Sequence, residues 1–391
     1  MKHLTIRHFG PLREAIVDIN KVNLVIGLQS SGKSCILKTA CHCAWVEKHI
    51  QMAQTAGDYE ESTKFIDRLL TYYKMQSYLS EHTYIEYSTD YMTFSYSHKT
   101  KHFSFKWNAA RWEYKKAKVS YIPSDRNLVA AIPAWSKLSL DYDNLLDFMA
   151  DWNEARKHLK TKANVLNLGM SYVYNPTANT DHVKLMNGRL IQLTESSSGV
   201  QSLIPLIVHL DYLGNRLTDD NSSKMLSFEE KEARKNLLST LYRKHKDTVS
   251  ASSSTENTYI SSIEGQIFAF VDEATAQQFA DLVHNFLYSD HNEIFLEEPE
   301  NNLYPTTQCQ LVDWLLDAVA DDERQDMLFV ATHSTYVLNQ LLKNRPPHMK
   351  LYVSHPVSDG GLYDVTAIAE EDYQDIYDNG VDLFLNFESY V

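Results

Sequence analysis

The stretch "GLQSSGKS", residues 27–34, lies between an apolar run at 22–26 and a segment with helical periodicity at 33–52. The apolar run predicts a short buried strand, so the chain must turn from strand to helix within this stretch. The stretch matches the pattern G-x-x-x-x-G-K-[ST] at every fixed position, in the context that the pattern requires. We therefore expect a loop that holds phosphate at the positive end of a helix.

The residue types in this loop have separate roles in nucleotide binding. Gly27 and Gly32 let the backbone bend so that its N–H groups point inward. Lys33 is expected to reach the β- and γ-phosphates of ATP, and the Ser34 hydroxyl to bind Mg²⁺. The predicted nucleotide-binding residues are those of the whole loop: Gly27, Leu28, Gln29, Ser30, Ser31, Gly32, Lys33 and Ser34. The alternative is a glycine-rich turn that only caps a helix, and the flanking strand and helix disfavour it.

Such a loop needs a carboxylate on a neighbouring strand, and "EIFLEEPE" (293–300) offers two. Its apolar residues predict a buried strand with Glu297 and Glu298 at the carboxyl end, where open α/β sheets bind ligands. We expect Glu297 to orient metal-bound water and Glu298 to be the general base for the attacking water. The alternative is a strand that runs into a solvated acidic loop.

Two further motifs stand in a fixed order relative to this loop. "TESSSGVQSLIPLI" (194–207) places Ser198 and Gly199 at the start of an apolar helix, whose positive end favours anions. "LFVATHSTYVL" (328–338) predicts a strand that ends just before His333. Taken alone, the first is an ordinary serine-rich helix cap and the second holds a structural histidine. Their order in the chain favours functional roles for both.

The wider pattern predicts one α/β unit. Alternating aromatic and polar residues at 83–122 indicate an antiparallel meander, and strands alternating with helices later in the chain indicate a parallel sheet. The expected fold is α/β, with a mixed or parallel core sheet, an antiparallel β subdomain and a helical insertion. We divide this single unit into 1–80 (N-terminal strands, loop and helices), 81–135 (antiparallel β), 136–213 (helix, hairpin and Ser-Gly motif), 214–262 (polar insertion) and 263–391 (acidic strand, His333 and tail).

Several shorter elements are also predicted. Helices are expected at 59–78 and 139–160, and a hairpin at 183–193 around the Asn187-Gly188 turn. Within the polar insertion, a charged helix at 228–245 precedes a Ser/Thr-rich stretch at 248–262. We expect that stretch to be mobile or shaped by a partner.

Composition limits the partners and the location. The net charge is −14, so a surface that attracts nucleic acid everywhere is excluded, although a local basic track is not. No run of eighteen apolar residues occurs, so we expect no membrane span and a cytoplasmic protein. The four cysteines form no disulfide framework. Cys41-His42-Cys43 is disfavoured as a metal site, because successive helical side chains point in different directions.

The four motifs in this order resemble those of ABC-type ATPases. The similarity is to the branch with RecF, SMC and OLD proteins, which includes AAA-15 and AAA-21-like ATP-binding proteins. It rests on the N-terminal segment that ends in "GLQSSGKS", and on "VSYIPSDRN" (119–127), "LEEPENNLYPTTQ" (296–308) and "ATHSTYVLN" (331–339). The chain departs from the family in lacking a convincing Q-loop glutamine. Asp125 and Arg126 stand roughly where that loop belongs.

The Ser-Gly motif resembles the family's signature, LSGGQ. Ser198, Gly199 and Gln201 match it, and Val200 replaces the second glycine. In the family, this motif meets the γ-phosphate bound by the opposite subunit, and a switch histidine senses that phosphate. The resemblance therefore implies a homodimer or higher homo-oligomer with composite ATP sites, in which His333 is the sensor.

The resemblance also implies a switch that binds and hydrolyses ATP with Mg²⁺. Stand-alone ATPases of this appearance occur in phage-defence systems such as PARIS and Septu, so a separate effector is expected, a nuclease or a Toprim-like protein. The residues after His333 lack the carboxylate spacing of a Toprim site, so we expect any nuclease to be a separate chain. The sequence also has no sustained heptad repeats, so the coiled-coil arms of SMC proteins are not expected.

Two other classes of function stay open. The first is a RecF-like DNA-binding ATPase of repair or recombination, supported by the basic cluster "RKHLKTK" (156–162) and opposed by the acidic balance. Nucleic acid is thus left open as a partner. The second is a kinase-like or metabolic P-loop enzyme, which leaves the Ser-Gly motif and His333 unexplained. The trigger, the effector and the oligomer size are not set by the sequence.

Overall fold

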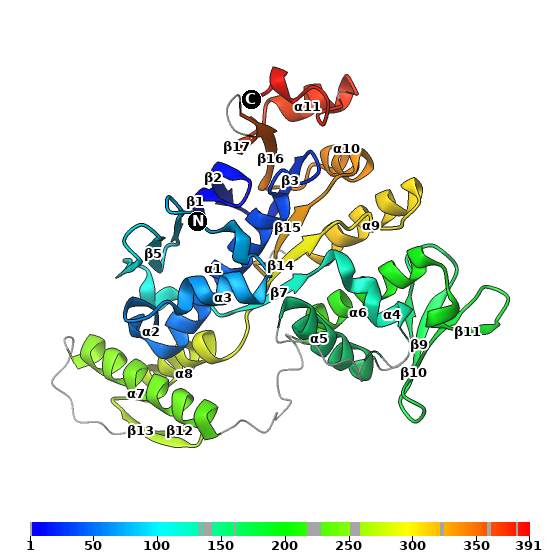
Figure 1. Cartoon of the computed structure of the whole chain (residues 1–391). Coiled ribbons are helices and arrows are strands. Elements are labelled where there is room, and N and C mark those ends of the chain that lie inside the picture. The colour runs from blue at the N-terminus through cyan, green and yellow to red at the C-terminus, as the bar shows by residue number, and fades with distance from the viewer. Residues whose placement is uncertain are drawn as a thin grey trace.

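The computed structural model describes residues 2–132, 135, 143–159, 162–216, 228–250, 259–320, 324–357, 361–380 and 382–391. Within these residues an 11-stranded mixed sheet forms the centre of the molecule (Figure 1). Its strands lie in the order β6 (His102–Trp107), β5 (Met92–Ser97), β4 (Tyr84–Ser88), β1 (Lys2–Phe9), β2 (Leu12–Ile19), β17 (Tyr363–Ala367), β16 (Met349–Pro356), β3 (Val22–Gly27), β15 (Met327–Ala331), β14 (His291–Glu297) and β7 (Ala117–Ile122). The expected α/β class and mixed core sheet are confirmed.

The sheet has a parallel half and an antiparallel half. Strands β7, β14, β15, β3 and β16 are parallel neighbours, whereas β6, β5, β4, β1 and β2 form an antiparallel run. The sequence analysis assigned 117–122 to the antiparallel meander, and that assignment is wrong. This segment is β7, which pairs in parallel with β14 and places Ile122 beside Leu296. Its last residues are buried in succession, because a strand covered on both faces loses the alternation of a meander.

Each face of the parallel half packs against its own layer of helices. On one face Leu24, Leu296 and Val330 belong to a core with helices α5 (Asn144–His158), α6 (Ser198–Arg216), α9 (Pro305–Ala318) and α10 (Thr335–Asn344). On the other face Val25 and Phe295 belong to a core with α1 (Lys33–Ala53) and α3 (Lys64–Tyr72). Neighbouring residues of one strand thus enter opposite cores, as strand geometry requires.

The described part of the polar insertion packs onto the rest of the molecule. Helix α7 (Phe228–Ser250) buries Leu237, Leu238 and Leu241 in a third core. Helix α7 lies beside β13 (Gln266–Phe270) and α8 (Glu273–Leu287) (Figure 1), which supply Phe268, Phe270, Phe279 and Phe286 to that core, and Tyr114 joins them. Helix α7 extends to Ser250, beyond the end at residue 245 that the sequence predicted. Its Ser/Thr-rich continuation is partly helix and partly the strand β12 (Tyr259–Ile263), and 251–258 lie outside the described residues.

Two other local predictions changed and one held. Residues 59–78 form α2 (Gly57–Glu60), α3 and a short 3₁₀ helix (Gln76–Tyr78) in place of one helix. The helix predicted at 139–160 is described from Asn144 onward as α5. The hairpin at 183–193 is confirmed as β10 (Thr180–Lys184) and β11 (Leu190–Gln192), which join β9 (Ser171–Asn175) and β8 (Ala163–Asn164) in a four-stranded sheet. In the described part of the chain, no helix is long and apolar enough to span a membrane.

Candidate nucleotide-binding site

The carboxyl edge of the parallel strands brings the predicted site residues together. Strand β3 ends at Gly27, β14 ends at Glu297, and β15 ends just before Thr332 and His333. Since β15 lies between β3 and β14, the loop, the acidic pair and the histidine follow three adjacent parallel strands. Sequence separations of hundreds of residues are thereby reduced to neighbouring positions on one sheet edge.

Lys33 is the buried cation of the loop. Its Nζ donates hydrogen bonds to the carbonyl oxygens of Gly27, at 3.0 Å, and Leu28, at 2.7 Å. These acceptors are neutral, and within the described residues the ammonium group has no direct carboxylate partner. Burial lowers the pKa of Lys33 to about 8, and the charges of Glu298 and Glu300 oppose that effect. The lysine is therefore largely protonated at pH 7 and poised to meet an anion.

Two positions of the loop can be occupied only by glycine, because neighbouring atoms leave no space for a Cβ atom. Gly27 has φ +150°, and a Cβ there would lie 2.5 Å from the carbonyl oxygen of Ser354. Gly32 has φ +93°, and its Cβ would lie 2.5 Å from Leu12. Ser354 also supports the loop from β16, because its hydroxyl donates to the Ser31 carbonyl at 2.6 Å. The sequence analysis did not identify Ser354, since it lies more than three hundred residues away in the chain.

Glu297 offers a buried carboxylate oxygen. Its side chain is 6% exposed, and Oε1 accepts no hydrogen bond among the described residues. Lys38 Nζ, on α1, lies 3.9 Å from that oxygen. The other oxygen, Oε2, accepts from the Ser124 backbone N–H at 3.4 Å. A buried carboxylate oxygen with only a long ion pair to Lys38 fits the hard, oxygen-preferring Mg²⁺ ion, for which the Ser34 hydroxyl is the second expected protein ligand.

Glu298 and His333 contact each other directly. Glu298 Oε1 lies 3.3 Å from His333 Nε2, and both side chains keep about a third of their exposure. The hydrogen bond from His333 lowers the pKa of Glu298, so the carboxylate is ionised at neutral pH. A third residue holds the histidine: Glu300 Oε1 accepts from the His333 backbone N–H at 2.6 Å. Glu300 was missed from the sequence, where it reads as one more acidic residue after Pro299.

The two weak Q-loop candidates have different environments. Asp125 is exposed, whereas Arg126 is fully buried and directs its guanidinium at backbone carbonyls around Glu297 and Glu298. Arg126 therefore supports the acidic strand and does not face the P-loop as a Q-loop side chain would. The only feature of the sequence that pointed to Arg126 was its position just after the strand at 117–122.

The Ser-Gly motif begins helix α6 as expected. Ser198 is the first residue of α6 and is exposed. A Cβ at Gly199 would lie 2.8 Å from the Asn302 carbonyl, so the helix start packs closely on the loop after the acidic strand. Gln201 turns back, and its amide donates to the carbonyls of Leu193 and Thr194. The exposed Ser198 side chain can therefore contact solvent or another molecule.

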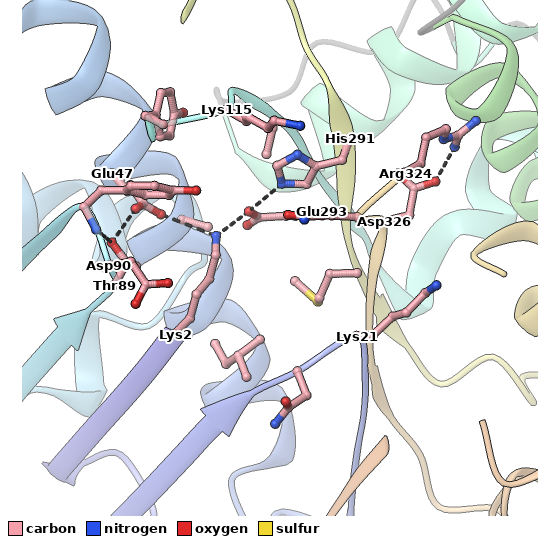
Figure 2. A pocket seen from close by; sticks show the side chains of 18 of the residues that line it. Lys2, Lys21, Glu47, Thr89, Asp90, Lys115, His291, Glu293, Arg324 and Asp326 are labelled. Atoms are coloured by element: carbon pink, nitrogen blue, oxygen red, sulfur yellow. Dashed lines mark hydrogen bonds and ion pairs between the residues drawn. The ribbon is translucent and has the colours of Figure 1, made fainter. Parts of the chain in front are cut away.

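A cavity of about 570 Å³ lies at the opposite edge of the sheet, where the parallel strands begin (Figure 2). Lys2 points into it, pairing with Glu293 and, at 3.4 Å, with Glu47. His291 lies 3.6 Å from Glu293, and Arg324 pairs with Asp326. Lys2, Glu47, Glu293 and His291 thus form one set of paired charges in this cavity, and Arg324 and Asp326 form another.

Comparisons with known proteins place these observations among solved structures. No family model matches the chain, and no curated protein matches it. One similar structure is the SMC head domain from Thermotoga maritima, at 11% identity and a TM-score of 0.43, covering 94% of this chain and 98% of that one. An ATP-binding cassette of an ABC transporter in its ADP conformation is similar at 10% identity and a TM-score of 0.31, over 97% and 96%. The recombination mediator RecF is similar at 11% identity and a TM-score of 0.29, over 93% and 97%.

Proposed function

We propose that the chain is an ATP-hydrolysing ABC-type switch that closes as a dimer around ATP and controls a separate effector. The observation that carries the proposal is the buried Lys33, bonded to neutral carbonyls, at the sheet edge that also carries the Glu298–His333 pair. A buried ammonium without a direct carboxylate partner is suited to receive an anion from outside. A carboxylate kept ionised beside it is suited to receive a proton from water.

The residues divide the reaction among themselves. Backbone N–H groups of the loop and Lys33 would hold the β- and γ-phosphates, and Ser34 and Glu297 would hold Mg²⁺, which would supply charge neutralisation at the phosphate oxygens. Glu298 accepts the proton of the attacking water. His333 stays within hydrogen-bond distance of Glu298 and orients its carboxylate. Hydrolysis then removes the negative charge of the γ-phosphate next to Lys33 and His333. The loss of this charge can switch the protein from a closed state to an open one.

The proposed dimer is supported by hydrogen-bond donors that one chain leaves exposed to solvent. The exposed Ser198 and the N-terminus of α6 offer donors to an anion without adding a buried charge. The phosphate needs donors on its open side, because water there would screen the site. We therefore propose that Ser198 and Gly199 of one subunit complete the ATP site of the other, in a homodimer or a higher homo-oligomer.

Glu298→Gln tests the catalytic role and the assembly together. Because the amide keeps the shape and cannot accept a proton, kcat should fall about 10²–10⁴-fold while ATP still binds. Mass measurement of this variant should show a dimer with ATP and Mg²⁺ and a smaller species without ATP. Hydrolysis at the wild-type rate would identify another residue as the base, and an ATP-independent mass would contradict closure around ATP.

Ser198→Arg tests whether the sites are shared between subunits. The variant should bind ATP yet lose most of its turnover, because the arginine blocks closure. In a mixed dimer with Lys33→Ala, one composite site carries both lesions and the other carries neither. Partial recovery of ATPase activity on mixing is expected. No recovery, with mixed dimers shown to form, would argue against sharing.

The DNA-binding alternative loses part of its support. In the basic cluster at 156–162, Arg156 is buried and pairs with Asp181 at 2.9 Å, and Lys157 pairs with Glu154 at 3.6 Å. Residues 160–161 lie outside the described part of the chain. Arg156 is thus committed to the fold and does not offer its charge to a phosphate backbone. Control of an effector in phage defence rests on the motif resemblance, and copurification of a nuclease with the ATP-locked Glu298→Gln protein would support it.

A further inference from the structure

Arg126 is a buried guanidinium surrounded by backbone carbonyls. It is fully buried, and its N–H groups donate at 2.8–3.2 Å to five carbonyl oxygens, those of Pro123, Ser202, Glu297, Glu298 and Pro299. None of these acceptors is a carboxylate. An arginine has five N–H donors, so its bonding capacity is spent on fixing backbone in place.

Three of those carbonyls belong to the turn that presents the proposed base. Glu298 has φ +41°, a left-handed conformation that is unfavourable for a non-glycine residue. Arg126 donates to the carbonyls of Glu297, Glu298 and Pro299 on both sides of this strained position. Hydrogen bonds from a charged donor are stronger than those between neutral groups, so these bonds favour the strained turn.

The same side chain reaches helix α6. Arg126 Nε donates to the Ser202 carbonyl at 3.2 Å, one helical turn after Ser198. A second contact joins the same two segments, because Gly199 packs against the Asn302 carbonyl so closely that a Cβ would lie 2.8 Å from it. The start of α6 and the loop that carries Glu298 are therefore attached to each other at two points.

We propose that Arg126 is a positioning residue that holds the Glu298 turn against helix α6, and so couples the base of one ATP site to the signature helix that serves the other. This inference rests on the proposed ATPase function and deepens it. Burial lowers the pKa of Arg126 to about 10, against the opposing charges of Glu300 and Glu298, so the side chain remains a cation at pH 7. Its carbonyl partners do not offer a carboxylate to neutralise it, which leaves its charge beside the base.

Arg126→Lys is the direct test. Lysine keeps the charge, but its three donors sit on one nitrogen and cannot span from Ser202 to Pro299. We expect kcat to fall about 10–100-fold, since a small misplacement of a catalytic group costs that much, while the ATP dissociation constant stays within about threefold. Arg156→Lys is the matched control, because Arg156 is also buried but bonds to Asp181 and Asn179 away from the P-loop. It should leave kcat unchanged.

A double-mutant cycle separates positioning from general destabilisation. If Arg126 acts through Glu298, then Arg126→Lys in the Glu298→Gln background should slow hydrolysis no further. Rates are expressed per bound ATP, so a partly unfolded variant still gives a result. An equal drop in both backgrounds, or a wild-type kcat for Arg126→Lys, would overturn the inference. An unmutated protein without ATPase activity would instead overturn the proposed function.

Discussion

Each edge of the core sheet holds a lysine, buried for Lys33 and partly buried for Lys2, and surrounds it differently. At the carboxyl edge, Lys33 bonds to two neutral carbonyls, and burial lowers its pKa to about 8. At the amino edge, Lys2 pairs with Glu293 and Glu47. Burial opposes the charge on Lys2, but the two carboxylates outweigh it and raise the pKa. In turn, Lys2 and His291 outweigh burial and lower the pKa of Glu293 to about 2.

The difference separates a binding site from a structural cross-link. A cation neutralised by carboxylates has little to gain from a further anion, whereas a cation held by carbonyls gains a full charge partner. In the cavity beside Lys2, the side chains of Lys2, Glu47, Glu293 and His291 pair with one another (Figure 2). The proposed phosphate site therefore rests on the partners of a buried charge and not on the size of the neighbouring cavity.

The largest expected effect separates the two lysines by ATP affinity. Lys33→Ala should raise the ATP dissociation constant by roughly 100-fold or more, because charge-assisted hydrogen bonds contribute about 1.5–3 kcal/mol each. Lys2→Met should leave ATP affinity within about twofold. Calorimetry with Mg²⁺ measures both. Equal losses in the two variants would mean that the edges are not independent, and no loss for Lys33→Ala would reject the P-loop assignment.

The second prediction concerns stability at the amino edge. Glu293→Gln should lower the free energy of unfolding at pH 7 by about 1–3 kcal/mol, less than a fully buried pair, because Lys2 is 23% exposed. The folded-state pKa of Glu293, about 2, lies below its unfolded value near 4.3, so its contribution exists above that value and is lost as the pH falls toward 2. The gap between wild type and variant should therefore narrow below about pH 4.5.

Urea denaturation between pH 7 and pH 3.5 measures this gap. Asp58→Asn is the control, because its ion pair with Lys64 is exposed and should contribute less than about 0.5 kcal/mol. A gap for Glu293→Gln that does not change with pH would show that packing, and not charge, accounts for the loss.

The smallest expected effects come from one hydroxyl at each edge. The Ser354 hydroxyl bonds to the Ser31 carbonyl in the loop, and the Thr89 hydroxyl bonds to Glu47 at 2.7 Å. Each bond is worth about 1 kcal/mol. Ser354→Ala should raise the ATP dissociation constant about fivefold, whereas Thr89→Val should lower stability by about 1 kcal/mol and leave ATP affinity unchanged. A loss of ATP affinity in Thr89→Val, with unchanged affinity in Ser354→Ala, would place the nucleotide at the amino edge of the sheet instead.

The α/β class and the local elements around the motifs could be predicted from sequence because they depend on local patterns. A strand, a glycine-rich turn and a helix are encoded within 22–53, and the strand end at Glu297 is encoded by the apolar run before it. The strand at 117–122 was misassigned, since alternation in an isolated segment does not reveal which neighbour it pairs with. The insertion was judged polar for a similar reason: its apolar residues are few, and only α8 and β13 show what they pack against.

By itself, the sequence determined the glycine-rich loop between strand and helix, the acidic strand end, the histidine and the Ser-Gly helix start, because each is a short pattern of adjacent residues. Only the tertiary structure decided which charges are paired. The sequence placed Arg126 only as a weak Q-loop candidate and gave Lys2 no role, yet Arg126 meets five carbonyls and Lys2 two carboxylates. Those partners are brought together by parallel strand order and by packing between residues as far apart as Lys2 and Glu293. Such contacts leave no periodic trace in the chain.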